Sequence, residues 1–238
     1  MSYGLRSFTS GGEWVINETQ PILHYVASAT YYTTNGDGVS AELVDIYRVT
    51  AARQPFVLLP IAQGNSAAVG RVYLVSGTTW EIEVVGTPAA VLCYMQLDTE
   101  APLSSYGIRV LNGSSKVLFD STRAPLWASE LFSIAGSSAT SPNVAALPGA
   151  ITLAQSYTSP AITAFSAGNH FRSIGQLGNP GTITNDFRRL GWQRTATGYT
   201  PVWISTADGA YEAVTVNYDH HASGISAHTV MVAETAGV

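Results

Sequence analysis

One cluster in the sequence combines side chains that could bind a metal. The stretch NYDHHASGISAH brings Asp219, His220, His221 and His228 close together along the chain. Imidazole and carboxylate groups are common ligands of divalent metals. If the stretch is a strand, however, His220 and His221 point to opposite faces. We therefore favour a solvated loop or an interface pair over a metal site, and predict neither a bound metal nor a cofactor.

Two glutamates could form a catalytic pair. In TWEIEVV, Glu81 and Glu83 alternate with apolar residues, so they share a strand face at a separation of about 7 Å. Such a pair would suit glycoside hydrolysis, although alternating glutamates on an exposed strand face are also common. The sequence holds no GxSxG, P-loop, HExxH or CxxC motif. We predict that the protein is not an enzyme, with a glycan hydrolase as the least favoured function.

A third cluster combines aromatic and arginine side chains. In RRLGWQRTATGY, Trp192 is flanked by Arg188, Arg189 and Arg194, with Tyr199 beyond them. Exposed Trp, Tyr and Arg residues are favoured at binding hot spots. The alternative for a Trp in a strand pattern is a core residue. We take this stretch as the candidate contact with a partner, a receptor or a glycan.

The elements that must position these side chains are strands. The dominant period of the sequence is two: in TWEIEVV, Trp80, Ile82 and Val84 share the face opposite the two glutamates. Turn signals rich in glycine and asparagine recur about every ten residues. No segment combines a helical period with an N-cap over three turns. The pattern predicts an all-β protein of β-sandwich-like architecture.

A stretch of nineteen residues occurs twice. SYGLRSFTSGGEWVINETQ begins at Ser2, and SYGIRVLNGSSKVLFDSTR begins at Ser105. Each copy is expected to form a β-hairpin. The second copy has Asn-Gly, a common hairpin dipeptide, at its turn. A tyrosine, a glycine and an arginine recur at fixed spacing and are predicted to anchor the hairpin, with the glycine allowing close approach or a positive φ. These anchors are Tyr3, Gly4, Arg6, Tyr106, Gly107 and Arg109.

Two weaker similarities follow in the same order. Residues 72–81 resemble 202–212, and residues 94–101 resemble 230–236. The sequence thus predicts two tandem β-sandwich-like domains related by internal duplication. They would span residues 1–103 and 104–238, and the extra length of the second would be an insertion within about 124–200.

Composition limits the partners. Charged residues make up 11 % of the chain, against about 25 % in typical proteins, and the formal net charge is −5. Affinity for nucleic acid depends on clustered Lys and Arg, so we expect no nucleic-acid binding. The longest apolar run, PFVLLPIA, is too short to cross a bilayer, so no membrane insertion is expected. The N-terminus lacks the pattern of a signal peptide, which favours synthesis in a cytoplasm.

Residues 131–171 contain no Asp, Glu, Lys or Arg. One interpretation is a flexible linker rich in Ser, Ala and Pro. The other is a set of strands and loops packed against a neighbouring subunit, because interface cores are depleted of charge. Apolar residues recur through the segment, so we favour the second interpretation. We also expect the second copy to have grown here.

The repeated hairpin resembles part of a known family. The pattern YGLR, a short hairpin and a hydrophobic return covers residues 3–23, and again 106–126, where it begins YGIRVLNGSSKVLFDSTR. It resembles minor tail proteins of long-tailed bacteriophages. The resemblance implies a virion component of the tail tip or baseplate that acts in tail assembly and host adsorption. It also implies other tail-tip or baseplate proteins as partners, and supplies no catalytic residues.

We therefore expect a non-enzymatic structural protein located in the tail of a virion and synthesised in the host cytoplasm. It would be oligomeric within the virion, with a host surface receptor as a further partner. The alternative is a receptor- or carbohydrate-binding module that uses an exposed aromatic and arginine surface at residues 188–199.

Overall fold

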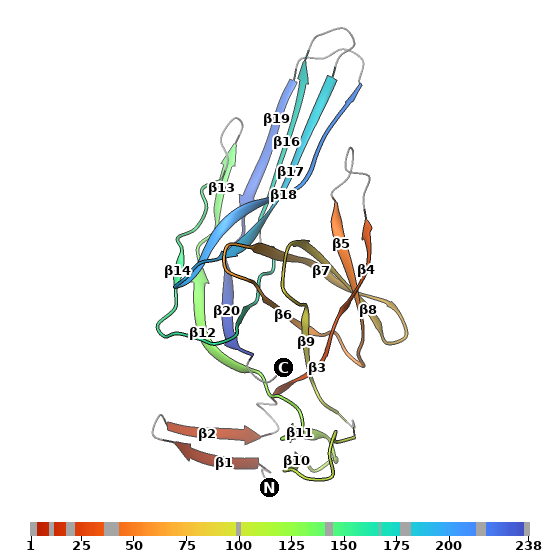
Figure 1. Cartoon of the computed structure of the whole chain (residues 1–238), viewed down its shortest axis with the longest axis vertical. Coiled ribbons are helices and arrows are strands. Elements are labelled where there is room, and N and C mark those ends of the chain that lie inside the picture. The colour runs from red at the N-terminus through yellow and green to blue at the C-terminus, as the bar shows by residue number, and fades with distance from the viewer. Residues whose placement is uncertain are drawn as a thin grey trace.

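The computed structural model describes residues 4–9, 12–17, 22–35, 43–98, 101–140, 145–166, 168–176, 182–212 and 218–235. Throughout these residues the regular elements are strands, so the all-β prediction is confirmed (Figure 1). The strands are β1 (Gly4–Thr9), β2 (Gly12–Asn17), β3 (Leu23–Ser28), β4 (Thr30–Asn35), β5 (Val44–Thr50), β6 (Phe56–Pro60), β7 (Ser66–Ser76), β8 (Thr79–Gly86), β9 (Leu92–Gln96), β10 (Arg109–Leu111), β11 (Val117–Asp120), β12 (Trp127–Ile134), β13 (Ser137–Thr140), β14 (Ile151–Thr152), β15 (Pro160–Ile162), β16 (Gly168–Gln176), β17 (Thr182–Arg194), β18 (Gly198–Glu212), β19 (Tyr218–Ile225) and β20 (His228–Glu234).

Both copies of the repeated stretch form two-stranded antiparallel hairpins. The hairpin β1–β2 and the hairpin β10–β11 lie side by side, with β1 near β10 and β2 near β11 (Figure 1). At the second turn, the side-chain carbonyl of Asn112 accepts hydrogen bonds from the backbone N–H groups of Ser114 and Lys116, at 2.9 Å each. This local bonding is what an asparagine supplies in a tight turn.

Two larger sheets form the body of the molecule. The six-stranded sheet has the order β12-β20-β15-β6-β9-β3, and the ten-stranded sheet runs β13-β19-β16-β17-β7-β8-β5-β4, with β18 paired to β17 and β14. The long strands β16 to β19 extend from the body as an arm (Figure 1). Each sheet takes strands from both the first and the second half of the chain.

The main core is also shared by the two halves. Leu59 of β6 pairs with Ile162 of β15, and both side chains are fully buried. In the same cluster, Ile82 from the first half packs with Trp192 and Val232 from the second. The expected division into domains 1–103 and 104–238 is therefore wrong, because neither half contains all of either larger sheet or all of the main core.

The six-stranded sheet nevertheless repeats one arrangement. From its two edges inward it reads β3-β9-β6 and β12-β20-β15. The β3–β9 pairing shifts register between Tyr25 and Ala27, and the β12–β20 pairing shifts between Ala128 and Glu130. These paired positions are 103 residues apart, the same spacing that separates the two hairpins. A β-bulge thus stands at matching places in the two halves.

The spacing changes farther along the chain. Cys93 pairs with Val57, and the corresponding pair is Val232 with Ile162. Val57 and Ile162 are 105 residues apart, whereas Cys93 and Val232 are 139 apart. The extra length therefore lies between Ile162 and Val232, where β16 to β19 build the arm. Residues 131–162 hold little of it, so the expectation that the second copy grew at 131–171 is wrong for most of that segment.

One of the weaker similarities has no structural counterpart. Residues 72–81 cross the turn between β7 and β8, whereas residues 202–212 lie within the single strand β18. Residues 94–96 end β9 and residues 230–234 end β20, which hold corresponding places in the six-stranded sheet. The strand pairings, however, equate Tyr94 with Ala233, three positions away from the register of the sequence match.

A shared core predicts one unfolding transition. Leu59→Ala should lower the free energy of unfolding by about 2–5 kcal/mol, because it leaves a cavity between the two halves. The urea transition should stay single and coincide by Trp fluorescence and circular dichroism. Leu74→Ala is the control, since Leu74 is exposed. Two separate transitions, with only one of them shifted by Leu59→Ala, would contradict the shared core.

Candidate functional site

The aromatic and arginine stretch runs from β17 through the turn that follows it to the start of β18, where Tyr199 lies. Trp192 and Tyr199 are both 0 % exposed and belong to the main core. Their expected exposure is wrong. The reason is that β17 is central in the ten-stranded sheet: Trp192 pairs with Ala67 of β7 on one side and with Pro201 of β18 on the other. Trp192 is thus a core residue, which was the alternative interpretation of a Trp in a strand pattern.

Arg189 is buried as well, whereas Arg188 is exposed. The guanidinium of Arg189 lies 3.7 Å from the Glu83 carboxylate, which also faces Arg71 at 3.6 Å. A Cβ at Gly70 would overlap the Arg189 guanidinium, so the glycine makes room for the pair. Arg189 therefore neutralises a buried carboxylate and does not form a surface contact.

The second glutamate of the candidate catalytic pair is bonded too. Glu81 accepts hydrogen bonds from Arg48 at 2.6 and 2.8 Å and from the Tyr73 hydroxyl at 2.7 Å. The Tyr73 hydrogen bond, together with Arg48, lowers the pKa of Glu81 despite its desolvation. Glu81 and Glu83 are nearly buried and engaged in ion pairs, so this strand face is not the solvated face that alternation suggested.

The candidate metal ligands are described only in part. The side chains of Asp219, His220 and His221 lie outside the described residues. His228 Nδ1 lies 2.8 Å from the Ser226 carbonyl oxygen. Among the side chains that the structure describes, no group of three His, Cys, Asp or Glu residues could hold a metal ion.

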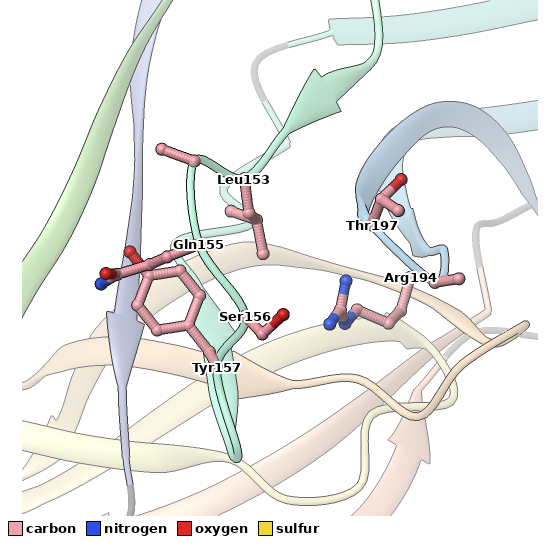
Figure 2. Close-up of a pocket in the computed structure, with 8 residues that line it drawn as sticks. Leu153, Gln155, Ser156, Tyr157, Arg194 and Thr197 are labelled. Carbon is pink, nitrogen blue, oxygen red and sulfur yellow. The ribbon is translucent and has the colours of Figure 1, made fainter.

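One member of the stretch, Arg194, borders a cavity. The cavity has a volume of about 230 Å³ and is lined by Leu153, Ala154, Gln155, Ser156, Tyr157, Arg194, Ala196 and Thr197. Figure 2 shows the Arg194 side chain directed from one wall toward the loop that carries Ser156. Tyr157 and Gln155 come from that loop, and Thr197 comes from the turn after β17. The loop residues lie in the charge-free segment, and no motif in the sequence pointed to them.

Backbone bonds fix Arg194 in place. Its N–H donates to the Asn65 carbonyl at 3.0 Å, and its own carbonyl accepts from Gly64 at 2.9 Å. The guanidinium donates to the Gly198 carbonyl at 2.8 Å and lies 5.1 Å from the Tyr199 ring centroid. A Cβ at Gly198 would overlap the Ile151 carbonyl, so this close approach requires glycine. The arginine is thus held by elements from both halves of the chain.

Two carboxylates fix the opposite wall. Glu130 accepts hydrogen bonds from the Ala154 N–H at 2.9 Å and from the Tyr157 hydroxyl at 2.8 Å. Glu234 accepts from the N–H groups that follow, those of Thr158 and Ser159, at 2.9 and 2.8 Å. Charge-assisted bonds of this kind are the stronger ones. The loop is therefore ordered before any ligand arrives.

The predicted hairpin anchors divide into different roles. Tyr3 lies outside the described residues, and only the backbone of Gly4 and Arg6 is described, in β1. Tyr106 is 88 % exposed, so its expected anchoring role is wrong within this chain. Gly107 has a φ of 153°, and a Cβ there would lie 2.8 Å from the Ser121 hydroxyl, as predicted for a close approach.

Arg109 does act as an anchor, through Asp120. The Arg109 guanidinium lies 3.1 Å from the fully buried Asp120 carboxylate, which also accepts bonds from the Thr122 hydroxyl and N–H at 2.6 and 2.9 Å. Burial opposes the ionisation of Asp120, but the Thr122 bonds and the arginine charges outweigh it and lower its pKa. The Asp120 N–H donates to Nε2 of His24 at 3.1 Å, which ties the hairpin to β3.

No protein-family model, curated protein or solved structure matches the chain. Within the described residues, no helix is long and apolar enough to cross a membrane. The function is therefore argued from the residues and their geometry.

The contact between His24 and Asp120 predicts a pH dependence. Burial lowers the pKa of His24 below 6.5. The contribution of neutral His24 to the free energy of unfolding is therefore fully present above pH 6.5 and is lost as the pH falls below that value. We expect the urea midpoint to fall between pH 7 and pH 5, and His24→Gln to reduce that fall, because glutamine can accept the same hydrogen bond without titrating. His228→Gln is the control and should keep the slope. A slope unchanged by His24→Gln would contradict the assignment.

Proposed function

We propose that the chain is a non-enzymatic structural protein of a bacteriophage tail tip or baseplate, acting in tail assembly and host adsorption. The resemblance of residues 3–23 and 106–126 to minor tail proteins supports this proposal. The low share of charged residues supports it as well, because interface cores are depleted of charge.

The observation that carries the proposal is the surface of the second hairpin. Leu103, Tyr106 and Ile108 are 68 %, 88 % and 61 % exposed. They lie at or just before β10, within or beside the stretch that carries the resemblance. Contiguous exposed apolar side chains mark interaction surfaces on soluble proteins. In the assembled tail, a neighbouring tail protein would cover these side chains and remove them from water.

We infer that the chain arose by duplication of a unit that contained one hairpin and three strands. The matching bulges and the repeated order β3-β9-β6 and β12-β20-β15 support this inference. The two hairpins then give one subunit two related attachment elements, side by side.

The cavity beside Arg194 favours a second candidate function, a receptor- or carbohydrate-binding module. The exposed aromatic surface first expected for that function is absent at Trp192 and Tyr199, which are buried. The cavity is a different surface, and its own lining and geometry support this function.

Removing apolar side chains from the hairpin surface should prevent assembly. We expect Tyr106→Ser combined with Ile108→Ser to lower incorporation into particles at least about tenfold, measured as copies per tail by quantitative mass spectrometry of particles from complemented infections. Both residues are exposed, so the unfolding temperature of the purified variant should change little. Leu74→Ser, at a 51 % exposed position on another hairpin, is the matched control. Normal incorporation of the double variant would contradict the proposal.

A further inference from the structure

We propose that the cavity beside Arg194 binds an acidic sugar residue and recognises its carboxylate. The ligand class is a monosaccharide that carries a carboxylate, either free or at the exposed end of a polysaccharide. The volume of about 230 Å³ lies below the roughly 300–1,000 Å³ of sites for drug-sized ligands, and so suits one sugar ring.

Arg194 brings a positive charge to the cavity. Six other cations among the described residues have a carboxylate within 4.0 Å; these are Arg48, Arg53, Arg71, Arg109, Lys116 and Arg189. Among the residues described by the structure, Arg194 has no such partner and donates one hydrogen bond, to Gly198. A guanidinium carries five N–H donors. Donors are therefore left over on the side of the cavity.

The geometry of those donors also suits a carboxylate. A guanidinium is a planar fork that matches the two oxygens of a carboxylate. The Gly198 bond and the Tyr199 ring hold the fork, and the backbone of Arg194 is bonded on both sides. Little side-chain freedom is lost when a carboxylate binds, so the site is pre-organised.

Neutral polar groups also line the cavity. These include the Ser156 and Thr197 hydroxyls, and no hydrogen bond within the described residues engages them. Hydroxyls both donate and accept hydrogen bonds, as sugar hydroxyl groups do. Figure 2 shows the Ser156 side chain directed toward Arg194, whereas the Gln155 and Tyr157 side chains lie on the other side of the loop.

A carboxylate fits this lining better than a phosphate does. Arg194 is the one cation among the lining residues, and the wall contains no helix N-terminus. Phosphate sites commonly use a helix N-terminus or several cations. One arginine fork with neutral polar neighbours instead matches a single negative charge on a polyhydroxylated ring.

The inference does not rest on the proposed tail function. If both hold, the cavity supplies a contact for host adsorption, since acidic sugars occur in surface polysaccharides. Binding by the purified chain and incorporation into particles are separate measurements, so the failure of one leaves the other standing.

The test is a titration of the purified, isotope-labelled full chain followed by amide chemical shifts. The probes are D-glucuronate, N-acetylneuraminate, D-glucose and inorganic phosphate. We expect saturable shifts with at least one of the two acids, at residues 153–157 and 194–198, with a Kd on the order of millimolar. We expect Arg194→Gln to weaken that binding at least about tenfold and Arg194→Lys to weaken it less. Arg188→Gln on the same strand should leave it unchanged.

Several outcomes would overturn the inference. These are no saturable shift with either acid, equal binding of D-glucose, tighter binding of phosphate, or full affinity in Arg194→Gln. Should Arg194→Gln fail to fold, Ser156→Trp serves instead, because Ser156 is exposed and a bulky side chain there fills the cavity. Retained affinity in Ser156→Trp would overturn the inference equally.

Discussion

The structure depends on the antiparallel contact between β6 and β15. There Leu59 and Ile162 stand opposite each other, fully buried, at the centre of the six-stranded sheet. Separating the halves would expose two unpaired strand edges and the apolar core above them. Each half is therefore stable only when it is packed against the other, although both halves carry a copy of the hairpin sequence. The same dependence holds in the ten-stranded sheet, where β7 meets β17.

The Arg194 cavity is a consequence of that joining. Its arginine is bonded to Gly64 and Asn65 from the first half, while its other wall is held by Glu130 and Glu234 from the second. A hairpin of the second half alone would have no such support. The hairpin β10–β11 depends on the same principle, since Asp120 reaches His24 across the halves. Sites in this molecule arise where the halves meet.

The strands themselves could be predicted from the sequence, but the strands that pair with them and the side chains that meet could not. Alternation put Ile82 and Val84 on one strand face, and both lie in the main core, because a period of two is a property of the strand itself. It could not show that Trp192 lies in a central strand, since that depends on pairing with β7 from the other half of the chain. Nor could it show that Arg189 reaches Glu83, a contact between residues more than one hundred positions apart.

The roles of Glu130 and Glu234 were equally hidden. Glu130 lies beside the register shift within β12 and Glu234 at the end of β20, but the N–H groups that donate to them belong to a loop with no charged residue of its own. A charge-free segment suggests either a linker or an interface when it is considered alone. Here carboxylates from outside the segment hold its backbone.

These contacts use carboxylates in a chain that has few charged residues. Arginines of the same chain pair with the carboxylates of Glu81, Glu83 and Asp120. Backbone N–H groups donate to those of Glu130 and Glu234. Few charges are left for the surface, so long-range repulsion between copies or partners is weak. Close association then depends on shape and on apolar side chains such as Tyr106. Arg194 has no carboxylate partner among the described residues, and a ligand carboxylate is the group that would complete it.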